Sequence, residues 1–152
     1  MARMRREDGF SLIELVSVIL LLGILSATVL PMFDTSGIDA STAAATVQTD
    51  IRFVQELALA RNPANVGDVG IIFTQGQSSY TITDPAGIFS LTRDLPNNVV
   101  ISQAPPTSGN LISFNKYGEP EIGSTDVSFQ ISTGGEIKTI TVEHFTGRVT
   151  VS

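Results

Sequence analysis

The sequence contains no cysteine and no tryptophan, and it has a single histidine. Without cysteine there is no disulfide, no thiolate metal ligand and no thiol nucleophile, although an exported domain of this size can fold without a disulfide. The one histidine, His144, belongs to no nucleophile motif, and the sequence has no glycine-rich phosphate loop and no paired-histidine metal motif. We therefore predict no catalytic residue, no cofactor and no metal.

Basic residues are also scarce. Nine Lys and Arg stand against fifteen Asp and Glu, which gives a formal net charge of −6. Downstream of residue 9 the basic residues are scattered along the chain: Arg52, Arg61, Arg93, Lys116, Lys138 and Arg148. Proteins that neutralise phosphates carry clustered Lys and Arg. The charge pattern therefore predicts no nucleic-acid partner.

One apolar run dominates the start of the chain. Residues 15–33 carry no charge, and from Phe10 onward only Glu14 interrupts the run. At about 1.5 Å per residue a helix over 10–33 would reach roughly 36 Å, which exceeds a hydrocarbon core of about 30 Å. Arginines precede the run and acids follow it, so the N-terminus should stay cytoplasmic. We expect a single membrane span over 10–33 and an exported C-terminal domain.

A second helical pattern covers residues 34–62. Its apolar positions have helical spacing on one face: Val47, Ile51, Val54 and Ala58, widened by Phe53 and Leu57. Four polar residues are expected to face water: Gln48, Asp50, Gln55 and Arg61. We expect Asp39 or Ser41 to cap the start, and Pro63 to end the helix. Together the two segments predict one long helix from Phe10 to about Asn62, bent near Pro31.

After Pro63 the pattern changes to short runs rich in β-branched and aromatic residues, with turn formers between them. We expect eight strands: 70–74, 79–83, 88–92, 98–102, 111–115, 127–132, 137–143 and 147–151. Most of them alternate apolar with polar residues, which is typical of an antiparallel sheet with one wet face. The sixth and seventh strands should form a hairpin through Gly134 and Gly135. The sequence thus predicts an α+β fold whose helix precedes an antiparallel β domain over 63–152.

The octet GFSLIELV, residues 9–16, lies between a basic leader and the apolar run. It resembles the processing motif of type IV prepilins and type II secretion pseudopilins. The resemblance implies that a membrane aspartic peptidase removes leader 1–9 by cutting between Gly9 and Phe10, and then N-methylates Phe10. It also implies the expected partners, which are prepilin peptidase/methyltransferase, other pilin or pseudopilin subunits and the inner membrane. The C-terminal domain would be periplasmic, and the subunit would join a filament after assembly.

The resemblance makes Glu14 the residue that sets filament register. A carboxylate inside a spanning helix is costly, by about 2.5–3.5 kcal/mol at the centre and less near the edge. The free amine of Phe10 on a neighbouring subunit would offset this cost. Two alternatives stay open: a carboxylate that only reaches the headgroups, and an uncleaved single-pass anchor carrying a periplasmic binding domain that does not polymerise. A secretory signal fits less well, because no good small-x-small site follows the run.

Helix-weakening residues are usual in pilin-like helices, and Gly23 and Pro31 occupy such positions. Gly23 costs about 1 kcal/mol relative to alanine, which would let the segment between these residues loosen in the filament. Packing of Gly23 against another membrane helix is an equally good explanation.

Segments 50–62, 94–102, 112–120 and 146–152 resemble the GspH/FimT group of minor pilins and pseudopilins. This resemblance implies a long N-terminal helix packed on two small antiparallel sheets. Members that serve DNA uptake end in Gly-Arg-x-Arg, whereas Gly147-Arg148-Val149 is followed here by Thr150. The missing arginine favours a role in secretion or pilus assembly, and we expect Arg148 to be a partly exposed strand residue that pairs with Glu143 or another acid.

Some major pseudopilins bind calcium, and four loop acids could supply oxygen ligands here: Asp84, Glu119, Glu121 and Asp126. Because the chain has no Asp-x-Asp-x-Asp-Gly loop, we expect these acids to be solvated instead.

Overall fold

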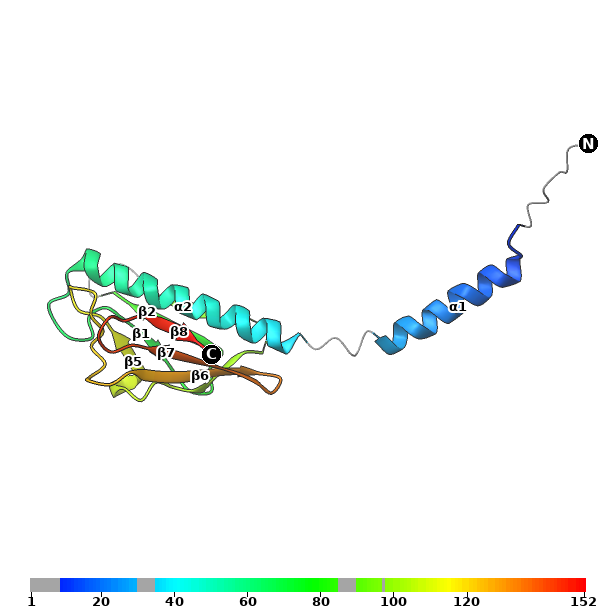
Figure 1. The fold of residues 1–152 in the computed structure, drawn as a ribbon. Helices are drawn as coiled ribbons and strands as arrows, with labels where there is room; N and C mark the ends of the chain where they lie inside the picture. The colour runs from blue at the N-terminus through cyan, green and yellow to red at the C-terminus, as the bar shows by residue number, and fades with distance from the viewer. Residues whose placement is uncertain (1–8, 30–34, 85–89, 97) are drawn as a thin grey trace, which may run out of the picture. The chain divides into compact units, whose positions relative to one another are not determined.

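The computed structural model describes residues 9–29, 35–84, 90–96 and 98–152. The chain divides into two compact units, residues 1–34 and 35–152, and Figure 1 shows the elements of each. The first unit contains α1 (Leu12–Val29), and the second contains α2 (Ser36–Arg61) and eight strands. The predicted bend at Pro31 lies outside the described residues, so a single continuous helix stays a prediction.

The membrane span predicted over 10–33 extends past α1 into residues 30–34, which lie outside the described residues. Among the residues that the structure describes, no helix is both long enough and apolar enough to cross a membrane.

The ends of α2 are set by backbone geometry. At its C-terminal end Asn62 adopts the left-handed conformation (φ 50°, ψ 58°) and its N–H bonds the carbonyl of Ala58. Pro63 follows, so the predicted stop is confirmed. The predicted caps are wrong, because the helix already starts at Ser36 and Ser41 donates its hydroxyl back to the Gly37 carbonyl at 2.7 Å.

The β domain consists of two four-stranded antiparallel sheets, ordered β3-β2-β1-β5 and β4-β6-β7-β8. The strands are β1 (Gly70–Phe73), β2 (Ser79–Thr83), β3 (Leu91–Asp94), β4 (Val100–Gln103), β5 (Leu111–Ser113), β6 (Val127–Thr133), β7 (Glu136–Val142) and β8 (Val149–Val151). Each of the eight predicted strands has a counterpart, although β3 lies later than 88–92 and β8 starts after Gly147. The predicted α+β fold, a helix packed on two small antiparallel sheets, is confirmed.

The predicted hairpin turn between β6 and β7 is also confirmed. Thr133 pairs with Glu136, and the two loop residues, Gly134 and Gly135, have φ of 56° and 91°. Positive φ at both central residues is typical of the type I′ turn, whose backbone twist matches that of the two strands in a two-residue hairpin. Glycine adopts these φ values without steric cost.

The core lies between α2 and the two sheets. The predicted stripe of Val47, Ile51, Val54 and Ala58 is fully buried, and alanines at 40, 43 and 44 continue it toward the start of α2. Phe53 does not widen the stripe as predicted. At about 100° per residue it lies more than 100° round the helix from the centre of the stripe, and it is 40% exposed.

The four polar residues of α2 that were expected to face water connect the helix to the sheets instead. Gln48 donates to the Val149 carbonyl at 2.7 Å, and Gln55 donates to the carbonyls of Gly118 (2.7 Å) and Thr146 (3.0 Å). The amide of Gln55 thereby joins two loops that are far apart in sequence.

Asp50 and Arg61 connect α2 to the first sheet. Asp50 is only 6% exposed, and its Oδ2 accepts a hydrogen bond from the Tyr80 hydroxyl at 2.7 Å and lies 3.3 Å from Nε of Arg93. Arg61 donates to Asp84 at 3.0 Å. The prediction that these four residues face water was therefore wrong, because they lie beside the buried stripe and form hydrogen bonds or ion pairs with the β domain.

Candidate processing and assembly site

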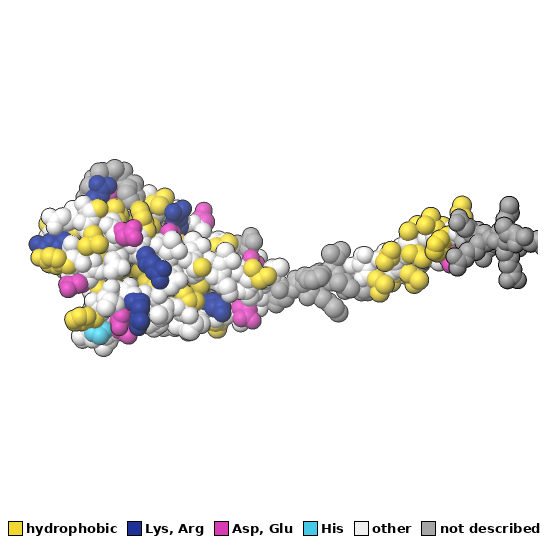
Figure 2. Space-filling view, turned by 45° about the horizontal axis from the view of Figure 1, so that its top comes forward, with side chains coloured by type: hydrophobic (Ala, Val, Ile, Leu, Met, Phe, Trp, Pro, Cys, Tyr) yellow, Lys and Arg dark blue, Asp and Glu magenta, His cyan; other side chains and the backbone are white. Residues whose placement is uncertain are grey.

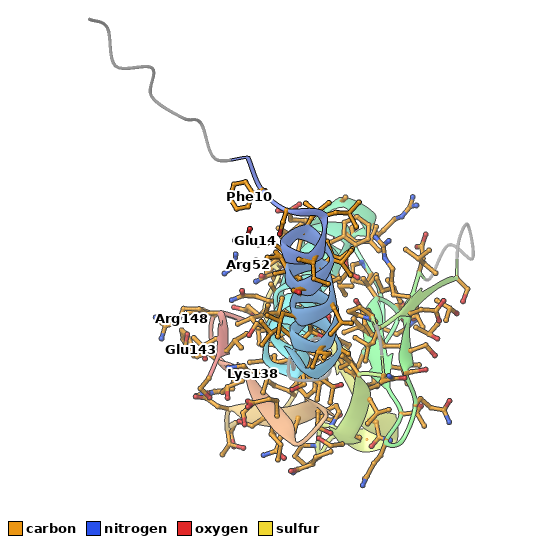
Figure 3. All side chains as sticks on the ribbon, turned by 90° about the vertical axis from the view of Figure 1, so that its right-hand side faces the viewer. Phe10, Glu14, Arg52, Lys138, Glu143 and Arg148 are labelled. Atoms are coloured by element: carbon orange, nitrogen blue, oxygen red, sulfur yellow. The ribbon has the colours of Figure 1, made fainter. Side chains whose placement is uncertain are left out.

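The predicted cleavage junction lies in non-helical backbone immediately before α1. Gly9 and Phe10 have no regular secondary structure, and Phe10 is 87% exposed. The next residue, Ser11, caps the helix: its Oγ accepts the N–H of Glu14 at 3.3 Å, and its carbonyl accepts the N–H groups of Glu14 and Leu15 at 3.1 and 3.2 Å. Figure 3 shows Phe10 and Glu14 at this start of the helix. The cap keeps the Gly9–Phe10 peptide outside the helix.

Glu14 occupies the third position of α1, in its first turn. Ser11-x-x-Glu14 is the sequence pattern of a capping box, and a carboxylate there also interacts favourably with the positive end of the helix dipole. This role was not predicted, although the octet contains the pattern. Glu14 therefore stabilises the start of its own helix, whatever it does between subunits.

The surface of α1 beyond Glu14 is apolar on all sides. Its large side chains from Leu15 to Leu25 are all substantially exposed on the helix itself. The hydroxyls of Ser17 and Ser26 donate to the carbonyls four residues earlier, both at 2.7 Å. A helix that is apolar all round is stable only where other apolar groups surround it, and such back-bonding suits serine to that environment.

The two predicted helix-weakening residues give different results. A Cβ added at Gly23 would meet nothing within 4 Å among the described atoms, so packing within α1 itself does not require glycine there. The functions left for Gly23 are helix weakening and contact with another helix. Pro31 lies outside the described residues.

Glu143 directly follows β7 and Arg148 directly precedes β8, so the two residues lie at the ends of the β7–β8 loop (Figure 3). Nε of Arg148 is 3.6 Å from Oε2 of Glu143, and the Arg148 side chain is 70% exposed. The predicted pairing is confirmed. Thr146 donates its hydroxyl to the same carboxylate, so this pair closes the β7–β8 loop.

The histidine also holds a loop. Nδ1 of His144 lies 2.7 Å from Oδ1 of Asp126, and the His144 backbone N–H donates to the same oxygen at 2.9 Å. The hydrogen bond from the His144 side chain holds the pKa of Asp126 below its usual value. His144 thus connects the β7–β8 loop to the segment before β6.

The remaining loop acids also interact with donors of the protein. Asp84 is buried against Arg61, so its predicted solvation was wrong. Glu119 accepts from Nδ2 of Asn115 at 2.8 Å, and Glu121 accepts the backbone N–H of Gly67 at 3.2 Å. Across the described part of the chain, His, Asp and Glu nowhere gather in a group of three that could hold a metal ion.

Comparison with known proteins bears on the N-terminal segment. Residues 4–30 match the family described as "Prokaryotic N-terminal methylation motif". No curated protein and no solved structure gives a significant match. The matched segment contains the octet and α1, and the motif implies that the N-terminus is anchored in a membrane. The match supports a type IV pilin-like protein, a structural subunit whose N-terminus is processed by prepilin peptidase and whose partners are other pilin subunits.

Proposed function

We propose that this chain is a minor pilin or pseudopilin of the GspH/FimT type. Prepilin peptidase removes leader 1–9, methylates Phe10, and the mature subunit enters an inner-membrane-based type II secretion or type IV pilus filament. The subunit initiates or tips the assembly of that filament. One observation carries the proposal: an exposed, non-helical Gly9–Phe10 segment lies directly before a capped helix whose only charged residue is Glu14, within a match to the methylation motif.

The organisation of the chain follows from this function. Residues 10–33 form the helix that is stored in the inner membrane before assembly and lies in the filament core afterwards. Residues 34–62 continue it as an amphipathic helix, and residues 63–152 form the periplasmic β domain. The exposed apolar surface of α1 supports this assignment, because both the bilayer and a bundle of like helices would bury it.

Processing and assembly are coupled through one charge pair. Hydrolysis of the Gly9–Phe10 peptide creates an ammonium group on Phe10, two residues before α1. In a neighbouring subunit the Glu14 carboxylate can pair with that ammonium and fix the axial register of the two helices. The pair is formed only by processed subunits.

The acidic β domain favours secretion or pilus assembly over DNA uptake. Three of the six basic residues in 35–152 form ion pairs with carboxylates of that same unit: Arg61, Arg93 and Arg148. A surface that binds phosphates needs unpaired, clustered cations, so we propose no nucleic-acid partner.

Mass spectrometry of the mature protein tests the processing step. We expect an N-methylated Phe10, and an intact Met1 start in a strain that contains the peptidase would refute the proposal. Gly9→Val is the matched variant. A Cβ at Gly9 meets nothing within 4 Å in the described part of the chain, so accumulation of precursor would report on the peptidase rather than on folding.

Two substitutions separate the functions of Glu14. Glu14→Ala removes both the capping carboxylate and the charge, whereas Glu14→Gln keeps a side chain that suits the third position of a capping box. We expect both variants to insert into the membrane and both to enter filaments poorly. Normal incorporation of Glu14→Gln would show that only the cap matters, and normal incorporation of both would remove Glu14 from assembly.

Crosslinking between helices distinguishes a filament subunit from an anchored binding domain. Cysteines placed singly along Leu15–Leu25, and singly in the apolar helices of other pilin-like proteins, should form disulfides between the chains in cells that build the filament. The native chain has no cysteine, so the background is empty. A membrane-anchored domain that does not polymerise would give no such crosslinks.

A further inference from the structure

A polar hollow lies where α2 ends, between the segment after the helix and the loop after β5. Its volume of about 390 Å³ is within the range of about 300–1,000 Å³ that is typical of small-molecule sites. Figure 2 shows this end of the domain on the left, where hydrophobic side chains lie among charged ones of both signs. We call it the amide hollow, because its polar and aromatic lining residues are Asn62, Asn65, Asn115, Lys116, Tyr117 and Glu121.

One wall of the amide hollow is a loop that hydrogen bonds hold in shape. Oδ1 of Asn115 accepts the backbone N–H groups of Tyr117 and Glu119 at 2.8 and 3.0 Å, and Nδ2 of Asn115 donates to the Glu119 carboxylate at 2.8 Å. Oε2 of Glu121 accepts the N–H of Gly67, in the opposite wall, at 3.2 Å. The two walls are thus joined, and the amide hollow is preformed, as small-molecule sites usually are.

The side-chain groups that remain available for a ligand are mainly neutral. The amide of Asn62 has no hydrogen-bond partner among the described residues, and Asn65 uses only its amide nitrogen, which donates within its own loop at 3.3 Å. The two charged groups already interact with the protein. Nζ of Lys116 lies 5.2 Å from the centroid of the Tyr117 ring, and one oxygen of Glu121 accepts the hydrogen bond that joins the walls.

Charged ligands fit the amide hollow poorly. Its lining contains one ammonium and one carboxylate, so neither sign prevails as cations do in a phosphate site. It also lies at the C-terminal end of α2, where the helix dipole disfavours anions. A hydrocarbon chain would leave the amides without hydrogen bonds, at a cost in free energy. A neutral ligand with many hydroxyl groups would satisfy them.

Tyr117 adds an aromatic surface to these polar groups. It is 69% exposed, and its backbone N–H is held by Asn115. The C–H groups on one face of a pyranose ring pack against an aromatic face, while the hydroxyls around its edge both donate and accept hydrogen bonds. An asparagine amide likewise offers two donors and an acceptor side by side. An aromatic face beside free amides is therefore suited to a sugar.

We infer that the amide hollow binds one pyranose unit of a neutral saccharide. The C–H face of the sugar packs on the Tyr117 ring, and its hydroxyls bond to the amides of Asn62 and Asn65 and to the second oxygen of Glu121. This inference goes beyond the proposed function and does not depend on it, because the hollow lies within one chain and needs no filament.

Saturation-transfer NMR on the full-length chain tests the inference. The protein is kept in dodecylphosphocholine micelles, because this detergent has no sugar headgroup, and it is irradiated in the aromatic region. The probes are the methyl glycosides of glucose, galactose, mannose and N-acetylglucosamine, and saturation should reach the ring protons of at least one of them. Tyr117→Ala should weaken its binding by roughly tenfold, whereas Tyr117→Phe keeps the ring and should change binding by less than about threefold.

Two further variants locate the site. Asn62→Gly removes the free amide but suits the left-handed backbone at the end of α2, so it should weaken binding by about two- to tenfold and leave the helix folded. Phe145→Ala removes another exposed aromatic side chain, which does not line the hollow, and should leave binding unchanged.

Three results would overturn the inference. The first is no saturation transfer to any of the glycosides. The second is equal binding by the native chain, Tyr117→Ala and Asn62→Gly, which would place the sugar elsewhere. The third is transfer to diglycine or binding of inorganic phosphate without any binding of a glycoside, which would assign the hollow to a charged ligand. Because this assay needs neither processing nor assembly, failure of those steps would refute the proposed function and leave this inference standing.

Discussion

Removing the Tyr80 hydroxyl measures how strongly the buried carboxylate of α2 holds the helix on the first sheet. Tyr80→Phe deletes the hydrogen bond of 2.7 Å to Asp50 but keeps the ring beside Phe73, whose centroid is 5.3 Å away. A hydrogen bond to a charged group contributes about 1.5–3 kcal/mol. We expect Tyr80→Phe to lower the free energy of unfolding by about 2 kcal/mol.

A double-mutant cycle with Asp50→Ala isolates the interaction. Asp50→Ala leaves a buried phenol without an acceptor and Arg93 without its partner, which should cost about 2–4 kcal/mol. Arg93 itself is half exposed, so its share is at most about 1 kcal/mol. In the Asp50→Ala variant the Tyr80 hydroxyl no longer has its hydrogen bond to Asp50, so removing the hydroxyl as well eliminates no further interaction between these two residues. The double variant should therefore be no less stable than Asp50→Ala, with a coupling energy of about 2 kcal/mol.

Urea unfolding of the mature chain in detergent, followed by circular dichroism, suits this cycle because the chain has no tryptophan. Tyr117→Phe is the control. It removes the hydroxyl of the other, exposed tyrosine, so unfolding should change by less than about 0.5 kcal/mol. A coupling energy below about 0.5 kcal/mol would refute the argument that this hydrogen bond orients α2.

Three further predictions follow from single contacts. Burial, and then the hydrogen bond to a carboxylate, raise the pKa of Tyr80 above its usual 10.0. The contribution of the protonated Tyr80 to stability is therefore present below about pH 10 and is lost above it, so urea midpoints should fall between about pH 9 and pH 11. Gln55→Leu removes two hydrogen bonds to loop carbonyls, so it should cost about 1–2 kcal/mol and speed amide exchange in both loops. Gly134→Ala should cost about 1–3 kcal/mol, because φ is +56° and the new Cβ would lie 2.7 Å from that of Ser36, whereas Gly135→Ala, in open space, should lower the melting temperature less.

Local patterns predicted most of the fold. The buried stripe of α2 was visible as helical spacing, the eight strands as short β-branched runs, and the hairpin turn as two adjacent glycines. Asp50 was not predictable in this way, because its partners Tyr80 and Arg93 are 30 or more residues distant. A helical wheel assigns a lone carboxylate to water, and only the tertiary structure shows the phenol and guanidinium that make its burial stable.

The residues of the candidate site likewise fall into those that contiguous sequence suggests and those that only the tertiary structure brings together. The cleavage junction and the assembly function of Glu14 stay predictions, and the sequence could suggest them because the residues of the motif follow one another in the chain. The sequence also allowed Ser11 to be predicted as a helix N-cap. It was not predicted, because the octet was considered as a processing motif and not as the start of a helix. The pairing of His144 with Asp126 was not predictable, since the two residues lie 18 positions apart in separate segments.

The helix start also explains why processing should precede polymerisation in the proposed function. Before cleavage Phe10 is joined to Gly9 by a neutral peptide bond and carries no ammonium group. The carboxylate of Glu14 then interacts only with the positive end of its own helix. Cleavage places an ammonium group two residues before α1, where the helix dipole disfavours a cation by about 0.3–1 kcal/mol. The Glu14 carboxylate of a neighbouring subunit removes that cost by pairing with the ammonium group. The same contact offsets the free-energy cost of burying the carboxylate. An unprocessed subunit offers no such exchange, so Glu14 favours the entry of cleaved neighbours alone.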